Sequence, residues 1–399
     1  MPKLTQEPPA PSPEAVRKAS ELTATAVEAL PEGRLAEQLD LGRPLRIKLG
    51  IDPTAPDIHL GHTVVLNKLR EFQDAGHQVV LIIGDYTARV GDPSGRSAQR
   101  PMLDPAQIDA NAETFMEQAF KILDRDRTEV RYNSEWLRME SDELFGLMAR
   151  TTVARLLERD DFQKRMAANE PISTLELMYP LLQGYDSVAV EADVEIGGTD
   201  QKFNLLFGRD MQSAYGRPLQ STMTMPILAG IDGVKKMSKS TGNYIGVTDP
   251  PEEMFGKVMR VPDANLREYW NLLLSEDPPA GVGPNEAKRE LARRLVARFH
   301  GGAAPAAAEE HFNRLFVRHE APEDVEEFEL PGDEVHLPAV IADAFGVSRS
   351  EARRSIAQGG VKLEGEALPP EPLDRPAAEL EGRVLQLGKR RFRRLVRGA

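Results

Sequence analysis

The feature that most constrains the fold of this chain is a strand–helix–strand pattern between residues 45 and 83. The first strand, LRIKLGI at 45–51, alternates toward a buried face, and the helix, TVVLNKLREFQDAG at 63–76, repeats apolar residues at helical spacing. The next segment, QVVLIIGD at 78–85, is a β-branched run typical of parallel sheets. This unit predicts an α/β fold with a Rossmann-like, doubly wound parallel sheet. Such sheets bind ligands outside the carboxyl ends of their strands, where the segment Asp52 to His62 lies.

Length and composition indicate a soluble protein with several domains. At 399 residues the chain exceeds what one hydrophobic core usually organises, so two or three domains are expected. No apolar run approaches the roughly 20 residues of a membrane helix, and the proline-rich, charged N-terminus lacks the apolar core of a signal peptide. We therefore expect a cytoplasmic protein that does not enter a membrane. The absence of cysteine excludes disulfides, zinc-thiolate sites and cysteine nucleophiles.

Charge is distributed unevenly along the chain. The net charge of -13 argues against a uniformly basic nucleic-acid binder. Residues 337–399 nevertheless hold 12 Lys and Arg against 8 Asp and Glu. Nucleic acid is therefore expected to bind at the C-terminal segment.

Changes of pattern divide the chain into five segments. A mixture of alanines, leucines and charges predicts a helix over 14–41, and helical patterns predict helices over most of 105–170. From Glu320 to Glu334, eight acids and no bases surround two prolines, which indicates an exposed linker. We expect an N-terminal helical segment at 1–42 and a Rossmann-like catalytic domain with a helical insertion at 43–245. An α-helical domain at 246–319, an acidic linker at 320–336 and a small α+β module at 337–399 are expected to follow.

The segment after the first strand ends in two histidines, His59 and His62, with Gly61 between them. A zinc site needs at least three protein ligands, and neither a cysteine nor an HExxH glutamate accompanies this pair. Incidental histidines at a surface turn are a second interpretation. Phosphate binding is a third, because a helix N-terminus offers free N–H groups and a positive dipole end to an anion. Gly61 would then allow close approach of a nucleotide, and the imidazoles would donate hydrogen bonds to phosphate.

A second motif, KMSKS at 236–240, precedes Thr241-Gly242-Asn243 in a polar loop. Such charge clusters are usually only solvated surface. Flexible lysines flanked by hydroxyls are also suited to bind a polyphosphate and to close over it when it reacts. The HxGH pattern near the start of a nucleotide-binding sheet, with KMSKS about 175 residues later, favours phosphate binding by both motifs.

This pair of motifs resembles the signature of class I aminoacyl-tRNA synthetases, and the sequence between them is similar to the tyrosyl-tRNA synthetases. The similarity covers about 43 to 261 and includes VGDPSGR, YPLLQGYDS and IGGTDQKFN, which begin at residues 90, 179 and 196. The resemblance implies a homodimeric tyrosine–tRNA ligase whose partners are tyrosine, ATP and the tRNA for tyrosine. It also implies Mg²⁺ carried by the ATP phosphates, with no metal held by the protein.

The resemblance assigns a set of tyrosine-binding residues. The substrate's ammonium would contact Asp92, Tyr179 and Gln183, and Gln201 would orient its carboxylate. Asp186 would accept a hydrogen bond from the phenol, which would make phenylalanine a poor substrate because the buried acceptor would stay unpaired. Two of these residues also have a structural interpretation: Tyr179 as an ordinary core residue and Asp186 as a helix cap.

The nucleotide side is assigned in the same way. The resemblance implies that two histidines and two lysines stabilise the leaving pyrophosphate. It places one aspartate and one glycine at the ribose, a second glycine at the adenosine, and Asp52 and Thr54 in the loop that opens the site. The implied catalytic residues are Thr54, His59, His62, Lys236 and Lys239. The implied ATP-binding residues are Asp52, Gly61, Gly198, Asp200 and Lys239.

One position departs from the family pattern. A better-known branch of the family has a tyrosine that shares the phenol contact, two residues before the glycine of its GxDPT segment. Lys48 stands there in this chain. The sequence does not identify what replaces that tyrosine, so a tryptophan–tRNA ligase is an alternative, although the GYDS and GGTDQ segments disfavour it.

The C-terminal segment predicts a helix, a turn at Gly346, a second helix from Ser348, a Gly-Gly pair and a strand. It resembles the small alpha-L RNA-binding module first described in a ribosomal small-subunit protein. A disordered basic tail is the alternative to a final strand pair containing Leu385, Leu387 and Phe392. The implied RNA-binding residues are Arg349, Arg353, Arg354, Lys389, Arg390 and Arg391.

Two rival functions belong to other classes of protein. A nucleotidylyltransferase of cofactor synthesis also uses HxGH and a mobile basic loop, but such enzymes are shorter and have no reason to carry an RNA module. A protein that only binds RNA would explain the C-terminus and leave KMSKS and the pocket motifs unexplained.

Overall fold

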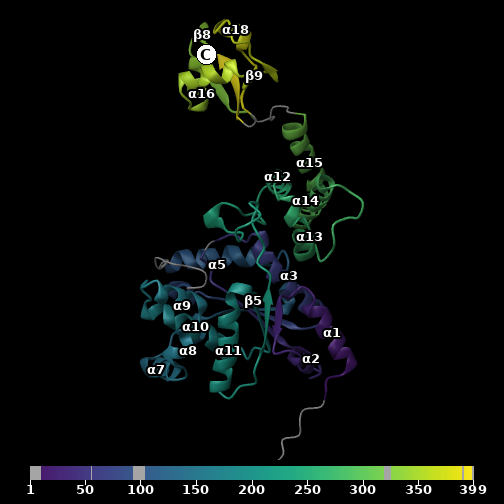
Figure 1. Cartoon of the computed structure of the whole chain (residues 1–399), viewed down its shortest axis with the longest axis vertical. Coiled ribbons are helices and arrows are strands. Elements are labelled where there is room, and N and C mark those ends of the chain that lie inside the picture. The colour runs from purple at the N-terminus through teal and green to yellow at the C-terminus, as the bar shows by residue number, and fades with distance from the viewer. Residues whose placement is uncertain (1–9, 55, 93–103, 319–324, 389–390, 398–399) are drawn as a thin grey trace, which may run out of the picture. The chain divides into compact units, whose positions relative to one another are not determined.

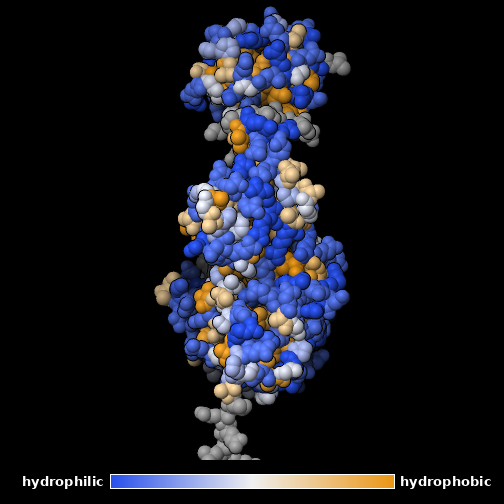
Figure 2. Space-filling model, turned by 90° about the vertical axis from the view of Figure 1, so that its right-hand side faces the viewer, coloured by the Kyte–Doolittle hydropathy of each residue, from blue (hydrophilic) through white to orange (hydrophobic). Residues whose placement is uncertain are grey.

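The computed structural model describes residues 10–54, 56–92, 104–318, 325–388 and 391–397. The chain divides into two compact units, of which one comprises residues 1–250 and 257–292 and the other residues 251–256 and 293–399. No helix among these described residues is long and apolar enough to cross a membrane. On the face drawn in Figure 2, apolar residues form small groups scattered among hydrophilic ones.

A six-stranded sheet forms the centre of the first unit (Figure 1). Its strands lie in the order β1-β6-β5-β2-β3-β4, and all neighbours are parallel except β1 and β6. The chain adds β3 and β4 on one side of β2, then β5 and β6 on the other, so the order reverses between β2 and β5. The strands are β1 (Glu28–Leu30), β2 (Arg46–Ile51), β3 (Gln78–Ile83), β4 (Thr128–Tyr132), β5 (Val194–Gly198) and β6 (Ser221–Met225).

The predicted β–α–β unit is confirmed. β2 and β3 pair from Arg46 opposite Gln78 to Ile51 opposite Ile83, and α3 (Leu60–Asp74) connects them. Side chains on the inner face of α3, including Phe72, are fully buried. The helix ends before Gly76, whose φ of +91° reverses the chain at little cost because glycine has no Cβ.

Two helices cover the sheet beside the switch of strand order. α10 (Thr174–Ala189) begins at Ser173, whose hydroxyl accepts the Glu176 N–H at 3.2 Å, and α11 (Lys202–Ala214) follows β5. Gly184 allows close packing of the two helices, because a Cβ there would lie 2.7 Å from Met211 Cγ. This contact fixes the face of α10 that points at the crevice.

The insertion between β3 and β5 is largely helical, as predicted, but it contains a strand that the prediction missed. β4 lies at the sheet edge and pairs only with β3. Its sequence, TEVRY, is half-buried throughout, so it lacks the apolar run that marks an inner strand. The helices are α4 (Thr87–Val90), α5 (Pro105–Ala119), α6 (Ser134–Leu137), α7 (Ser141–Met148), α8 (Val153–Leu156) and α9 (Asp160–Ala167).

The prediction of one helix over 14–41 is wrong. Two helices, α1 (Pro13–Thr23) and α2 (Arg34–Leu39), flank the short strand β1, which pairs antiparallel with β6. Pro31 cannot donate a helical hydrogen bond, and Gly33 has a φ of +79°, so no helix can pass through this stretch.

Residues 250–318 are helical, as the sequence predicted. Their longest helix, α14, is interrupted neither by proline nor by glycine after its first residue. The helices here are α12 (Pro251–Met259), α13 (Leu266–Leu274), α14 (Pro284–His300) and α15 (Ala304–Phe312).

Residues 325–397 have a hydrophobic core of their own, in which Leu337, Ile341, Ile356 and Leu395 meet. The predicted helix–turn–helix–strand order is confirmed, with a φ of +65° at Gly346. The sheet order is β10-β9-β12-β13-β7, and β8 pairs with β11. The elements are β7 (Glu327–Leu330), β8 (Glu334–His336), α16 (Leu337–Phe345), α17 (Arg349–Ala357), β9 (Val361–Leu363), β10 (Glu366–Ala367), β11 (Asp374–Pro376), α18 (Ala377–Leu380), β12 (Val384–Leu387) and β13 (Arg391–Arg397).

The acidic segment 320–336 differs from the exposed linker that its composition predicted. Residues 319–324 lie outside the described part, but 327–330 and 334–336 form strands. Leu330 and Val335 point into the core while the flanking acids stay exposed. The acids within these two strands therefore lie on the outer face, an alternation that the count of charges concealed.

Candidate active site and RNA-binding surface

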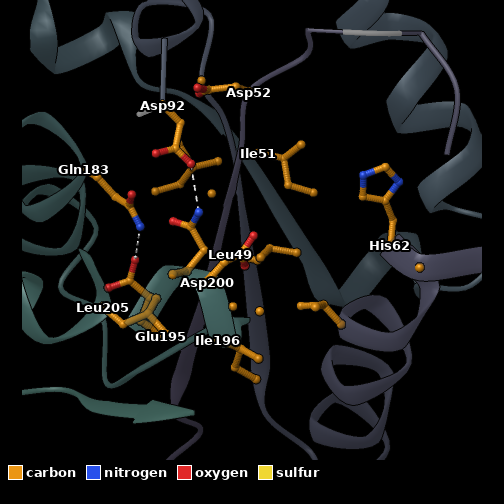
Figure 3. A pocket seen from close by; sticks show the side chains of 18 of the residues that line it. Leu49, Ile51, Asp52, His62, Asp92, Gln183, Glu195, Ile196, Asp200 and Leu205 are labelled. Carbon is orange, nitrogen blue, oxygen red and sulfur yellow. Dashed lines mark hydrogen bonds between the residues drawn. The ribbon is translucent and has the colours of Figure 1, made fainter. Parts of the chain in front are cut away.

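A pocket of about 280 Å³ opens at the carboxyl ends of β2 and β5. The structure brings to it almost every residue that the sequence analysis proposed for tyrosine and ATP. Asp92 and Gln183 lie on one side of the pocket and His62 on the other (Figure 3). Lys239 does not line the pocket itself. The proposed residues that do so are Asp52, Thr54, His59, Gly61, His62, Asp92, Tyr179, Gln183, Asp186, Gly198, Asp200, Gln201 and Lys236.

Asp52, the first residue after β2, lies among hydroxyl groups. Its carboxyl oxygens accept hydrogen bonds from Thr87 Oγ1 at 2.6 Å and from the Tyr179 hydroxyl at 3.0 Å. Loss of solvent raises the pKa of Asp52 to about 7, and the charge of Asp92 adds to that rise. The sequence analysis assigned Asp52 to ATP, whereas its contacts connect it to Tyr179, on the tyrosine side.

Gly84 makes this position of Asp52 possible. A Cβ at Gly84 would lie 2.1 Å from Asp52 Oδ1 and 2.4 Å from Thr87 Oγ1. No side chain fits between these groups. The sequence analysis placed Gly84 in a strand and gave it no function, because its importance arises from contacts between separate segments.

The two histidines stand at the first turn of α3. Their rings stack with centroids 3.9 Å apart, and His62 Nδ1 accepts the backbone N–H of His59 at 3.2 Å. Desolvation and nearby lysines lower the pKa of His62 to about 4, and desolvation together with His62 lowers the pKa of His59 to about 2. Both rings are therefore neutral at pH 7. Because His62 Nδ1 accepts, its proton resides on Nε2, which is free to act as a donor.

The KMSKS loop is anchored by its middle residue. Met237 is buried, and its N–H donates to the Leu228 carbonyl at 3.0 Å. Asn243 supports the same loop by accepting the Ser238 N–H at 2.8 Å and donating to Asp232 at 2.9 Å. The prediction of a polar loop is confirmed, and the buried methionine adds an anchor that the sequence analysis did not identify.

Both lysines of the KMSKS motif form ion pairs with carboxylates beside the pocket. Lys236 Nζ lies 2.5 Å from Asp200 Oδ2, and Lys239 forms an ion pair with Asp57. Lys239 also lies over the ring of Tyr244, with Nζ 5.9 Å from its centroid. Two cations are thus held at the edge of the pocket, next to the helix N-terminus that carries His59.

The opposite end of the pocket is formed by one face of α10. Tyr179, Gln183 and Asp186 lie four and three residues apart, so they point the same way. Gln183 Nε2 donates to Glu195 at 3.3 Å, while Gln183 Oε1 has no hydrogen-bond partner in the described part of the chain. Gln201 Nε2 donates to Asp92 Oδ2 at 2.8 Å.

Asp186 is a buried carboxylate of this end. Trp136 Nε1 donates to its Oδ1 at 2.8 Å, and Asn133 Nδ2 lies 3.5 Å from its Oδ2. Burial raises the pKa of Asp186 to about 7, and the charge of Lys48 opposes that rise. The sequence analysis missed Trp136 and Asn133. They follow the edge strand β4, which was itself not predicted.

The C-terminal module exposes a basic helix. Arg349, Arg353 and Arg354 are exposed on α17, which begins at the Ser348 cap. On β13 Arg391 is exposed, and its guanidinium lies 5.9 Å from the ring centroid of Phe345. The other two proposed RNA-binding residues, Lys389 and Arg390, lie outside the described residues.

Comparisons with known proteins identify the family of the chain. A family model described as tRNA synthetases class I (W and Y) matches residues 40–317. A tyrosine–tRNA ligase of Moorella thermoacetica is 50% identical over 399 residues, with 96% of each chain covered. One of Coxiella burnetii is 49% identical, with 93% of this chain and 96% of that chain covered.

Solved structures share the fold. A truncated mitochondrial tyrosyl-tRNA synthetase of Aspergillus nidulans superposes with a TM-score of 0.61 at 21% identity, covering 76% of this chain and 94% of that one. One of Archaeoglobus fulgidus, solved with L-tyrosine, has a TM-score of 0.60 at 23% identity, covering 73% and 99%.

The sheet, the pocket and the family model define a class I tRNA synthetase of the tryptophan and tyrosine type. Within that class, the chain belongs to the family of the tyrosine–tRNA ligases.

Replacing Gly84 by alanine is expected to lower the free energy of unfolding by about 1–3 kcal/mol, because the new Cβ would overlap Asp52 and Thr87. Urea unfolding measures the change. Gly146→Ala in α7 is the matched control, since no atom lies within 4 Å of its Cβ position and alanine favours a helix. Equal stability of the two variants would show that the packing around Gly84 accommodates a Cβ, which would contradict the prediction.

Proposed function

We propose that the chain is a tyrosine–tRNA ligase, which activates tyrosine with ATP and then transfers it to the 3′ end of its tRNA. The observation that carries this proposal is that one pocket joins a carboxylate-rich end on α10 to a phosphate-binding end formed by α3 and the KMSKS loop. The relatives at about 50% identity have the same name.

The proposed tyrosine site lies along α10. The unpaired Gln183 Oε1, the Tyr179 oxygen and the carboxylate of Asp92 suit the three protons of the substrate's ammonium. Asp186 accepts a hydrogen bond from the phenol. Trp136 supports this role, because it already donates to one carboxyl oxygen and so fixes where the remaining lone pairs point.

The reaction of the first step is in-line attack of the tyrosine carboxylate on the α-phosphorus of ATP, which releases pyrophosphate. The residues contribute positioning and electrostatic stabilisation, with no covalent intermediate on the protein. His59 and His62 donate as neutral imidazoles, and Lys236 and Lys239 balance the charge that develops on pyrophosphate. The described residues contain no group of three metal-ligating side chains, and in this proposal Mg²⁺ enters with the ATP phosphates.

ATP also changes the ion pairs of the loop. The ribose contact proposed for Asp200 competes with its pair to Lys236, so nucleotide binding releases that lysine toward the phosphates. Lys239 exchanges Asp57 for phosphate in the same way. Thr54 and Gly61 line the route between the two ends.

We further propose that residues 337–399 bind tRNA through α17 and that the enzyme is a homodimer. Helices α7 and α8 leave Phe145, Met148 and Val153 more than two-fifths exposed, which suits a surface covered by a second copy. Sedimentation of the full chain measures the oligomeric state.

Tyrosine-dependent exchange of labelled pyrophosphate into ATP, without RNA, tests the central proposal. Exchange with tyrosine is expected. Exchange only with tryptophan would point to a tryptophan–tRNA ligase, and none with either amino acid would contradict the proposed reaction.

Lys239→Ala is expected to slow adenylate formation by roughly 100- to 1,000-fold in single-turnover experiments, because it removes a charge that stabilises the leaving pyrophosphate. Tyrosine binding is expected to be unchanged. Lys235→Ala, an exposed lysine in the same loop, should leave the rate unaltered. An unchanged rate in Lys239→Ala would remove this lysine from the mechanism.

Replacing Arg349, Arg353 and Arg354 together by glutamate is expected to raise the KM for tRNA by roughly 10-fold or more at 0.1 M salt, because phosphate contacts and their counterion release are lost. Pyrophosphate exchange without tRNA should be unchanged. Arg383→Glu, an exposed arginine of the same module, is the control. Normal charging by the triple variant would contradict the RNA-binding role of α17.

A further inference from the structure

An ion pair is buried directly beneath the tyrosine end of the pocket. Lys48 on β2 and Glu195 on β5 stand opposite each other in the register of the two strands, with Nζ and Oε1 2.8 Å apart. Their side chains are 0% and 1% exposed. The pair therefore crosses the sheet at the point where the strand order reverses.

Every polar group of this pair has a partner. Lys48 Nζ also donates to Ser187 Oγ at 2.7 Å and to the Gln183 carbonyl at 3.0 Å, so all three ammonium protons are used. The second oxygen of Glu195 accepts from Ser187 Oγ at 3.0 Å and from Gln220 Nε2 at 2.5 Å. A fully paired network tolerates burial, whereas a single unpaired charge within it would not.

Stability alone does not account for the pair. Replacing a buried ion pair by apolar residues of similar size is often neutral or stabilising, because two charges must be removed from water. A contribution to the pocket is therefore the better explanation.

The pair touches the proposed tyrosine site at two places. Glu195 holds the Nε2 of Gln183, which turns the unpaired Oε1 of the same amide toward the proposed position of the substrate's ammonium. Lys48 binds the carbonyl of Gln183 and the hydroxyl of Ser187, the residue that follows Asp186. Lys48 is also a positive charge that favours the ionised form of the Asp186 carboxyl, and this effect exceeds the opposing effect of the Glu195 charge on the pKa of Asp186.

We propose that the Lys48–Glu195 pair determines tyrosine specificity by holding Asp186 as a hydrogen-bond acceptor for the phenol and Gln183 as an acceptor for the ammonium. This inference rests on the proposed tyrosine–tRNA ligase function. Both residues of the pair act through others, so they are positioning residues. Lys48 acts on the tyrosine site through its charge, from beneath the pocket. In this proposal the charge takes the place of a second side chain that would contact the phenol directly.

The double variant Lys48→Gln/Glu195→Gln removes both charges and keeps polar groups that can bond across the strands. We expect it to fold, with a melting temperature close to that of the parent protein. In pyrophosphate exchange, the KM for tyrosine should rise roughly 10- to 100-fold with a smaller change in kcat, and the preference for tyrosine over phenylalanine should fall by a similar factor.

The matched control is Lys68→Gln/Glu71→Gln. Lys68 is 1% exposed and pairs with Glu71 within α3, and neither residue lines the pocket. This variant should keep the tyrosine-to-phenylalanine ratio of the parent protein. If the Lys48–Glu195 pair were purely structural, its double variant would change the stability of the protein and leave the tyrosine-to-phenylalanine ratio unaltered. That outcome would overturn the proposal.

Ser187→Ala provides a second measurement if the double variant does not fold. It keeps both charges and removes the hydroxyl that bonds to each of them. A several-fold decrease in the tyrosine-to-phenylalanine ratio is expected, and an unchanged ratio contradicts the proposal. Absence of tyrosine-dependent exchange in the parent protein would instead contradict the proposed function, so the two failures are distinguishable.

Discussion

The parallel pairing of β2 with β5 is the contact on which the rest of the structure depends. Because the strand order reverses between them, the loops that follow these strands diverge and leave a crevice at their carboxyl ends. The loop after β2 leads to His59 and α3, and the turn after β5 leads to Asp200 and α11. α10 closes the third side with Tyr179, Gln183 and Asp186. Residues from distant parts of the chain thus meet in one pocket.

The charges of the pocket are arranged in two ends that suit the two substrates. At the proposed tyrosine end, burial raises the pKa of Asp52 and of Asp186 to about 7, so an ammonium and a phenol bound there as proposed would stabilise the ionised carboxylates. At the nucleotide end both histidines are neutral, and the positive charge lies on Lys236 and Lys239, which neighbouring carboxylates already balance. In the proposed function, ATP exchanges the Lys236–Asp200 and Lys239–Asp57 pairs for contacts with phosphate, so little uncompensated charge is created at this end.

Periodicity and motif spacing were sufficient to predict the β–α–β unit, the position of the site and the C-terminal helix–turn–helix–strand order. The prediction missed two strands that are recognisable only from their pairing with another strand. β1 is three residues long and exists through pairing with β6, and β4 is a half-buried edge strand. Trp136 and Gly84 have no local signal, because their importance comes from contacts with Asp186 and Asp52 that only the folded chain creates. The same holds for the partner of Lys48, which lies 147 residues later on a neighbouring strand.

In the proposed function, specificity for the phenol depends on residues around Asp186 as well as on Asp186 itself. Asp186 alone would be a carboxyl group whose burial favours its protonated form, which is a poorer acceptor. Trp136 fixes its orientation by direct donation, and Lys48 favours its charge from beneath the sheet. Lys48 is in turn tolerable only because Glu195 and Ser187 use its protons. The residues at 48 and 195 therefore form one unit, because neither charge can be buried without the other. Together they connect the strand switch that creates the crevice to Asp186, the carboxylate that we propose selects the amino acid.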